Sequence, residues 1–371
     1  MKYAGKALCF DDILLKPGIS DVTSRGNVDL TMSHKDFSLS LPVFSAPMDS
    51  VTGFDMVLAM NEAGGMGVLP RNGIDQSQVF LQLTTGLDFH DFFYSISSSM
   101  GIREFDEMEW LKEHGHRLIC VEVAHGGNIQ AVRKVEALRD MFPEALIMSG
   151  NVATFDEFIK LSDAGASFIR VGIGGGSACT TRIETGHGVP TLQSIIDIDK
   201  MRKDTDAAII ADGGLRSSGD AAKAFAAGAK FVMLGGMLAR TNSAPEIRDS
   251  NNNLVFRGMA SSVFTDRVEG VSHALDRNGV SSVDVLSGFG NGLRSACSYS
   301  GVHELSSLCG ESEYVNDLIR VRFGPCRVTA IGETPEHTLF ICVDVYDIEH
   351  VIEWKDDEEI EVVFMIEEEV H

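Results

Sequence analysis

Eight short apolar runs recur along the first two thirds of the chain, each ending at glycine, proline or a polar residue. Runs of this length that contain β-branched residues are typical of strands buried on both faces, as in a parallel sheet. The runs occupy residues 41–47, 64–70, 94–101, 118–126, 145–152, 168–176, 207–214 and 230–236. We therefore predict eight such strands.

Helical spacing of apolar residues separates most of these runs, for example in residues 128–141, 155–164 and 219–227. Strand–helix alternation repeated eight times is the pattern of an α/β fold of the (β/α)₈ TIM barrel type. A doubly wound open sheet is the alternative, but it seldom contains as many βα units. The pattern therefore favours the barrel.

The remaining segments suggest where the barrel ends. Residues 70–94 are too short a connection for an inserted domain, and residues 254–321 do not fit another βα unit. From Cys326 onward apolar and acidic residues alternate with the period of strands, and the last thirty or so residues hold about a dozen carboxylates. We expect a barrel domain over 1–324 and a small, acidic, β-rich extension over 325–371, which favours a solubilising edge or a subunit contact.

Composition narrows the function classes. Hydrophobic residues make up 44% and charged residues 23%, which excludes a disordered or collagen-like chain. Lys and Arg number 31 against 54 Asp and Glu, a formal net charge of −23 that opposes binding to nucleic acid or to an anionic membrane. An anionic small substrate would therefore need a local site of backbone N–H groups.

Cysteine usage and the termini indicate a compartment. The seven cysteines are scattered, odd in number and without a C-x-x-C pair, which fits a reducing, cytoplasmic location. The first residues lack an apolar stretch typical of a signal peptide, and no run of about 18 apolar residues predicts a membrane-spanning helix.

Candidate chemistry lies in the loop that follows the sixth run, because active sites of barrels are built from the loops after the strands. This loop reads V-G-I-G-G-G-S-A-C-T-T-R from Val171 to Arg182. Its glycines let backbone N–H groups approach a ligand, and Ser177 adds a hydroxyl. Cys179 is a candidate nucleophile here, with an inert core cysteine as the alternative.

Paired glycines follow the seventh and eighth runs, as Asp212-Gly213-Gly214 and Gly235-Gly236. Backbone amides at these two positions match the phosphate site common to many barrels, although such glycines can also simply form tight turns. The carboxylate of Asp212 would repel a phosphate, so we expect it to hold a ribose diol.

These residues, together with several longer motifs, resemble the inosine-monophosphate dehydrogenase / GMP reductase family from Phe10 to about Val321. The motifs stand in the family's order and are F-D-D-I-L-L-K-P (10–17), A-P-M-D-S-V-T (46–52), G-N-V-A-T (150–154), I-A-D-G-G-L-R (210–216), V-M-L-G-G-M-L-A (232–239), F-R-G-M-A-S (256–261) and G-L-R-S-A-C-S-Y-S-G (292–301).

The resemblance implies a barrel enzyme that binds a purine nucleoside 5′-monophosphate and exchanges a hydride with NADPH or NAD. Cys179 would attack C2 of the purine, with Thr181 and Glu269 completing the catalytic set. The other implied residues are Met48, Ser177, Asp212, Gly214, Gly235, Gly236, Gly258 and Met259 for the substrate; Glu122, Asn151 and Gly172 for the cofactor; and Gly174, Gly176 and Cys179 for a monovalent cation such as K⁺. The family also implies a homotetramer.

Two positions depart from the family pattern. Glu122 stands where family members have Asp in the motif D-x-A-H/N-G, and Gly175 stands where the cysteine loop usually has proline. The first departure bears on cofactor preference. The second predicts a more flexible loop, because glycine restricts the backbone least.

The interval from Arg257 to Gly270 distinguishes the two activities of the family. In dehydrogenases a long flap with an Arg-Tyr pair activates water, whereas here the interval is short and Arg267 precedes Val268. The tandem regulatory domain common in dehydrogenases is also absent. Glu269 alone does not discriminate, because many bacterial dehydrogenases share it. We predict an NADPH-dependent reductase that converts a guanosine or deoxyguanosine monophosphate to the inosine form. An NAD-dependent IMP dehydrogenase that forms XMP, or a silent nucleotide-binding relative, is the alternative.

Overall fold

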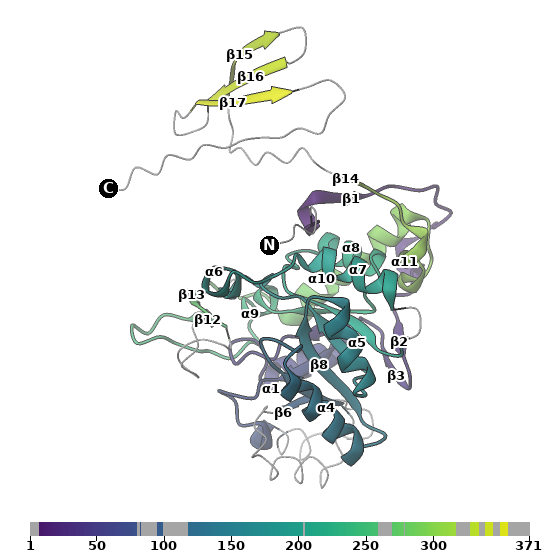
Figure 1. Cartoon of the computed structure of the whole chain (residues 1–371), viewed down its shortest axis with the longest axis vertical. Coiled ribbons are helices and arrows are strands. Elements are labelled where there is room, and N and C mark those ends of the chain that lie inside the picture. The colour runs from purple at the N-terminus through teal and green to yellow at the C-terminus, as the bar shows by residue number, and fades with distance from the viewer. Residues whose placement is uncertain are drawn as a thin grey trace. The chain divides into compact units, whose positions relative to one another are not determined.

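The computed structural model describes residues 7–79, 82, 95–98, 118–202, 205–258, 269–277, 279–316, 327–333, 338–343 and 349–354 of the 371-residue chain (Figure 1). The chain divides into two compact units. The first comprises residues 1–10 and 15–313, and the second comprises residues 11–14 and 314–371.

Eight parallel strands of the first unit form a closed barrel, in the order β10-β11-β4-β5-β6-β7-β8-β9. They are β4 (Val43–Ser45), β5 (Met66–Leu69), β6 (Ser95–Ser98), β7 (Leu118–Glu122), β8 (Leu146–Val152), β9 (Phe168–Val171), β10 (Ala208–Asp212) and β11 (Phe231–Leu234). Each predicted apolar run contains one of these strands, so the barrel prediction is confirmed. Pairing of β9 with β10 and of β11 with β4 completes the closure.

Helices cover the outside of the barrel (Figure 1). The longer ones are α1 (Phe54–Glu62), α4 (Ile129–Met141), α5 (Phe155–Asp163), α7 (Thr191–Met201), α8 (Ser218–Ala226) and α10 (Ser282–Ser300). The three segments predicted from helical spacing form α4, α5 and α8. The sequence pattern did not assign residues 254–321 to a βα unit, but α10 packs against both α8 and α1 and so supplies the helix of the eighth unit.

Local sequence signals account for where several helices begin. Thr154 accepts a hydrogen bond from Glu157 N while the Glu157 side chain accepts one from Thr154 N, a capping box that starts α5. Asn128, Ser217 and Ser281 cap α4, α8 and α10 in a similar way, each accepting a backbone N–H. These caps satisfy donors that a helix start would otherwise leave without partners.

A short hairpin closes the amino end of the barrel. It consists of β2 (Met32–His34) and β3 (Phe37–Leu39). The Phe37 ring stacks on Phe44 at 6.0 Å between centroids and meets the edge of Phe168 at 5.3 Å. Phe44 and Phe168 lie at or near the starts of β4 and β9. Aromatic packing therefore fills this end, and the opposite end of the barrel is the one available for a site.

A second hairpin, β12 (Val255–Arg257) and β13 (Ser272–Ala274), follows β11 and the short helix α9 (Gly236–Ala239). Its strands are antiparallel, with Arg257 opposite Ser272. Among the described residues, further short helices of this unit are η2 (Arg25–Asn27), α6 (Thr181–Thr185), η4 (Leu305–Ser307) and α11 (Leu308–Glu311). In the described part of the chain no helix is long and apolar enough to span a membrane.

The second unit is built from strands. β14 (Tyr314–Asn316) pairs with β1 (Ile13–Leu15), which follows η1 (Phe10–Asp12). β15 (Arg327–Glu333), β16 (Thr338–Val343) and β17 (Glu349–Trp354) form an antiparallel sheet with β16 in the centre. The predicted β-rich character of the C-terminal region is confirmed. The acidic segment 359–370 and the predicted boundary at 324/325 lie outside the described residues.

Candidate active site

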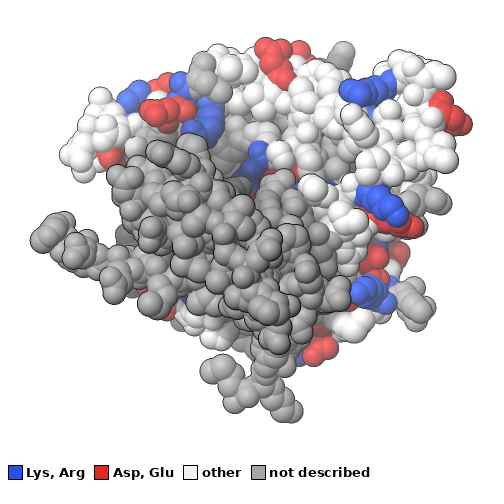
Figure 2. Space-filling view, turned by 90° about the horizontal axis from the view of Figure 1, so that it is seen from above, with Lys and Arg blue, Asp and Glu red and all other residues white. Residues whose placement is uncertain are grey.

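The carboxyl ends of the barrel strands hold most of the residues predicted for the site. Met48 lies after β4, Asn151 lies within β8 near its end, and Asp212 ends β10. The loop 172–180 follows β9 and leads into α6. On the face shown in Figure 2, the described basic and acidic side chains lie beside one another and form no continuous basic patch.

Cys179 lies beside the two other predicted catalytic residues. Its side chain is half-buried, and Cys179 Sγ is 3.1 Å from Thr181 Oγ1, a hydrogen bond in which either atom can donate. Thr180 N donates to Glu269 O at 2.9 Å, and Cys179 forms a β-bridge with Gly270. The structure therefore brings the thiol, a hydroxyl and the backbone of Glu269 together.

Small residues surround the predicted phosphate position. An added Cβ at Gly236 would lie 3.5 Å from Ser177 Oγ, and one at Gly235 would lie 3.6 Å from Met48 Sδ. Gly213 and Gly214 have φ of +93° and +84°, which residues with a side chain rarely adopt. These positions bring the loops after β4, β9, β10 and β11 into close approach, and without side chains the glycines let a ligand come near their backbone.

Asp212 is held from two sides. Its Oδ2 accepts from Asn151 Nδ2 at 2.8 Å and from Arg170 Nε at 2.9 Å. Asn151 Nδ2 also donates to Gly172 O at 3.0 Å. Three residues predicted for substrate and cofactor, Asp212, Asn151 and Gly172, are thus joined in one network. Arg170, which the sequence reasoning did not select, fixes the carboxylate that we expect to hold the ribose.

Glu122 ends β7 and is 8% exposed. Burial raises the pKa of Glu122, although the positive charges of Arg170 and Arg71 oppose this shift. Arg71 Nε lies 3.6 Å from Glu122 Oε2, beyond hydrogen-bond distance. Burial acts against the charge of Arg170, but the charges of Asp212, Cys120 and Glu122 outweigh it, so its pKa is raised.

Three buried polar atoms around Glu122 can still form hydrogen bonds. Glu122 Oε2, Arg71 Nε and Arg170 Nη1 are buried and have no hydrogen-bond partner among the described residues. Such atoms are costly unless a ligand or water satisfies them. One acceptor and two donors fit the amide and hydroxyl groups of a nicotinamide nucleoside, so the residues present are compatible with the predicted cofactor.

The loop after β7 is tied to the neighbouring helix. His125 Nε2 lies 2.8 Å from Glu157 Oε1, and Glu157 Oε2 accepts from Ala153 N and Thr154 N. Although burial opposes the shift, these hydrogen bonds lower the pKa of Glu157. The capping box of α5 therefore also positions the loop that follows Glu122.

An ion pair that the sequence reasoning missed joins two of its motifs. Asp49 of A-P-M-D-S-V-T is fully buried, and Arg257 Nε of F-R-G-M-A-S donates to Asp49 Oδ2 at 2.8 Å. Arg170 interrupts the apolar run 168–176, and Asp49 follows the run 41–47. A charged side chain next to buried apolar residues indicates a buried partner of opposite charge. The sequence gives no indication of which partner it is.

Three of the predicted glycines lie in the cysteine loop or against it. An added Cβ at Gly258 would lie 2.7 Å from Ala178 O, so this approach of β12 to the cysteine loop requires glycine. Gly174 has φ of +78°, and Gly176 O accepts from Cys179 N at 3.1 Å. Because a carbonyl oxygen has a second lone pair, this geometry is compatible with cation binding. Met259, Arg267 and Val268 lie outside the described residues.

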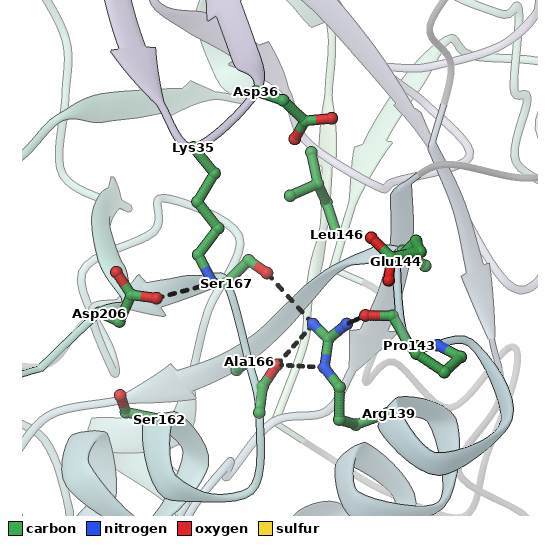
Figure 3. A pocket seen from close by; sticks show the side chains of 12 residues that line it. Lys35, Asp36, Arg139, Pro143, Glu144, Leu146, Ser162, Ala166, Ser167 and Asp206 are labelled. Carbon is green, nitrogen blue, oxygen red and sulfur yellow. Dashed lines mark hydrogen bonds and ion pairs between the residues drawn. The ribbon is translucent and has the colours of Figure 1, made fainter.

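One cavity of about 390 Å³ lies at the opposite end of the barrel (Figure 3). Its lining includes Lys35, Arg139 and Asp206, and none of the predicted site residues. Lys35 pairs with Asp206 at 3.1 Å, and Arg139 donates to the carbonyls of Gly165 and Pro143. These charged groups hold the loops between elements, so we assign no ligand to this cavity.

Comparison with known proteins agrees with this geometry. The sequence profile described as "IMP dehydrogenase / GMP reductase domain" matches residues 7–318. The chain is 34% identical over 332 residues to the GMP reductase of Vibrio atlanticus (strain LGP32), which covers 83% of this chain and 94% of the relative. It is 33% identical over 329 residues to GMP reductase 1 of Mus musculus, with the same two coverages.

Proposed function

Because the chain belongs to the IMP dehydrogenase / GMP reductase family, we propose that it is an oxidoreductase that reductively deaminates a guanosine 5′-monophosphate. The observation that carries this proposal is the contact of Cys179 Sγ with Thr181 Oγ1, held beside the backbone of Glu269. Similarity to proteins named GMP reductase supports the direction of the reaction.

Nucleotide binding would use the network at the strand ends. Backbone N–H groups near Gly214, Gly235 and Gly236, with Ser177 Oγ, would hold the phosphate against the repulsion of a net charge of −23. Asp212, fixed by Asn151 and Arg170, would accept hydrogen bonds from the ribose hydroxyls. Met48 would contact the base. This arrangement would orient C2 of the purine toward Cys179.

Covalent catalysis by Cys179 divides a difficult substitution into two steps. In the first step the Cys179 sulfur bonds to C2, the C2–N bond breaks and ammonia leaves. The thiol proton and the proton delivered to the departing nitrogen pass through Thr181 and the Glu269 carboxyl group. In the second step a hydride bonds to C2, the C2–S bond breaks, and the product is the inosine form with Cys179 restored as a thiolate.

NADPH, when bound, would supply the hydride for the second step. Glu122, Arg170 and Asn151 would hold its nicotinamide end, since two of these residues have polar atoms without partners among the described residues. Their task is to place the cofactor against C2 and to exclude water from the adduct. Carbonyls at Gly174, Gly176 and Cys179 would bind K⁺ and stabilise the cysteine loop.

The IMP dehydrogenase reaction is the second candidate. It would require a group that activates water to hydrolyse the adduct. The interval between Arg257 and Gly270 is short and lacks the Arg-Tyr pair expected of that activity, which favours the reductase. Either activity would use the same thiol, so product analysis is needed to separate them.

The test follows the absorbance of the reduced cofactor with purified protein. Loss of absorbance with GMP and NADPH is the expected result, with IMP confirmed by mass. Gain of absorbance with IMP and NAD would instead establish the dehydrogenase. Cys179→Ala should abolish turnover while GMP affinity stays within about threefold, because the thiol forms a bond only during the reaction. Turnover retained in this variant would exclude Cys179 as the nucleophile.

A further inference from the structure

The Asp49–Arg257 ion pair lies near the site, and its carboxylate is fully buried. Asp49 is 0% exposed, and both Arg257 Nε and Nη2 donate to its Oδ2. The other carboxylate oxygen, Oδ1, has no partner among the described residues. A buried carboxylate that loses its cation is strongly destabilised, so Asp49 fixes the position of the Arg257 side chain. Because Asp49 is fully enclosed, it cannot itself touch a substrate.

Backbone hydrogen bonds connect the segment that follows Arg257 to the cysteine loop. Gly258 N donates to Val271 O at 3.1 Å, and Val271 N donates to Ala178 O at 3.1 Å. Thr180 N donates to Glu269 O at 2.9 Å. Cys179 therefore lies between two residues that are each hydrogen-bonded to the hairpin. An added Cβ at Gly258 would approach Ala178 O to 2.7 Å, so the fit is close.

Asp49 also belongs to the loop that carries Met48. Met48 Sδ lies near Gly235 at the end of β11, and Arg257 N donates to Ser50 Oγ at 3.3 Å. The pair thus joins the loop expected to contact the base with the loop that carries the thiol. These two loops come from β4 and β9, which are not neighbours in the barrel.

We propose that Asp49 and Arg257 are positioning residues that align the Cys179 loop with the Met48 loop through the β12–β13 hairpin. This inference rests on the proposed function, since alignment matters where a sulfur must reach C2 of a bound purine. Small misplacements of a reacting group can cost large factors in rate, whereas binding contacts elsewhere persist. The expected signature is a loss in kcat with little change in KM.

Hydrogen exchange tests the alignment without relying on turnover. Asp49→Asn keeps the shape of the side chain and removes its charge. We expect peptides covering residues 177–182 and 269–275 to exchange about tenfold faster in this variant, while β8 and β10 change by less than about twofold. Asp199→Asn is the matched control, because it removes the charge of the Asp199–Arg202 pair, 2.8 Å apart at the C-terminal end of α7. It should leave both peptides unchanged.

Kinetics of the same variants complete the test. Asp49→Asn should lower kcat at least about tenfold with KM for GMP within about threefold, and Arg257→Lys should retain more kcat than Arg257→Met because it keeps the charge. Unchanged exchange in the two peptides, an equal increase in β8 and β10, or an unchanged kcat would each overturn the proposal. If the wild-type protein turns over no GMP, the proposed function fails, and the exchange pattern still decides whether Asp49 and Arg257 hold the Cys179 loop in place.

Discussion

At the residue scale, sequence motifs predicted which loops meet at the barrel end, but they did not predict which charged side chains pair there. Cys179 and Glu269 are ninety positions apart, yet the structure places their backbones side by side. The motifs predicted that Cys179 and Glu269 belong to one site, because the motifs lie in loops that follow strands and such loops meet at one end of a barrel. The same motifs did not pair Arg170 with Asp212 or Asp49 with Arg257, since an ion pair depends on side-chain directions that only the closed barrel determines.

Glu269 should act in chemistry more than in binding. Its backbone is held by Thr180 N, so Glu269→Gln keeps the hydrogen-bonded loop and replaces only the carboxyl group with an amide, which cannot act as a general acid. We expect kcat to fall about 100-fold, the lower end for loss of a general acid, with the Kd for GMP unchanged. Single-turnover kinetics and calorimetry would measure both. Glu246→Gln, at an exposed pair with Arg248, is the control. Equal losses in kcat and affinity would argue for a merely structural Glu269.

Glu122 should make stability fall as pH rises. Burial raises its pKa in the folded protein, so the folded state retains a proton that the unfolded state loses near pH 4.3, roughly the unperturbed value. The contribution of Glu122 to the free energy of unfolding is fully present below that pH. It is lost as pH rises through the pKa that Glu122 has in the folded protein, by at most about 1.4 kcal/mol per pH unit.

Glu122→Gln cannot titrate and should remove this dependence. The free energy of unfolding of the variant relative to wild type should therefore increase with pH across the same window. Urea unfolding at a series of pH values would measure it, with the exposed Glu136→Gln as control. Parallel curves for wild type and Glu122→Gln would show that the Arg71 and Arg170 charges fully compensate burial.

At the scale of elements, the strands were the most predictable feature. A strand buried on both faces is mostly apolar, and in a barrel it must end where the chain turns into a loop, so Gly and Pro mark its end. The β2–β3 hairpin was not predicted, because strands of three residues are too short to show a period of two. Neither was the role of α10, which lies beyond the inserted β12–β13 hairpin.

The β2–β3 hairpin should weaken in mild acid. His34 is 7% exposed, and its ring meets the edge of Phe168 at 5.2 Å. Burial, with Lys230 and Lys35 nearby, lowers its pKa to about 4. Because the unfolded chain binds a proton near pH 6.5, stability is lost as pH falls from roughly 6.5 to 4, by up to about 3 kcal/mol.

His34→Leu should abolish that part of the pH dependence, since leucine neither titrates nor needs a hydrogen bond. Urea unfolding between about pH 4 and pH 7 would measure the slope. The exposed His303→Gln variant is the control, because His303 pairs with Asp21 at the surface. A wild-type slope that survives in His34→Leu would assign the acid sensitivity to other groups.

At the scale of the whole molecule, the range that the family profile matches includes the barrel but not the predicted C-terminal extension. The family profile ends at residue 318, and 83% of this chain covers 94% of the Vibrio atlanticus relative. The predicted extension thus lies beyond the segment that the family profile matches, and its alternation of apolar and acidic residues predicted strands that the structure contains in β15, β16 and β17. Its acidic charge was predictable from composition, whereas what it contacts was not.

Removal of residues 325–371 should therefore leave GMP turnover within about twofold of wild type, because every residue assigned to the chemistry lies before Gly270. The truncated protein loses 14 Asp and Glu side chains, so its elution from anion exchange should shift to lower salt. Sizing by light scattering, for both forms, addresses the predicted homotetramer. A tetramer in both forms would place the subunit contacts on the barrel, whereas dissociation on truncation would assign the extension to assembly. Loss of turnover without dissociation would contradict the independence of the site from this extension.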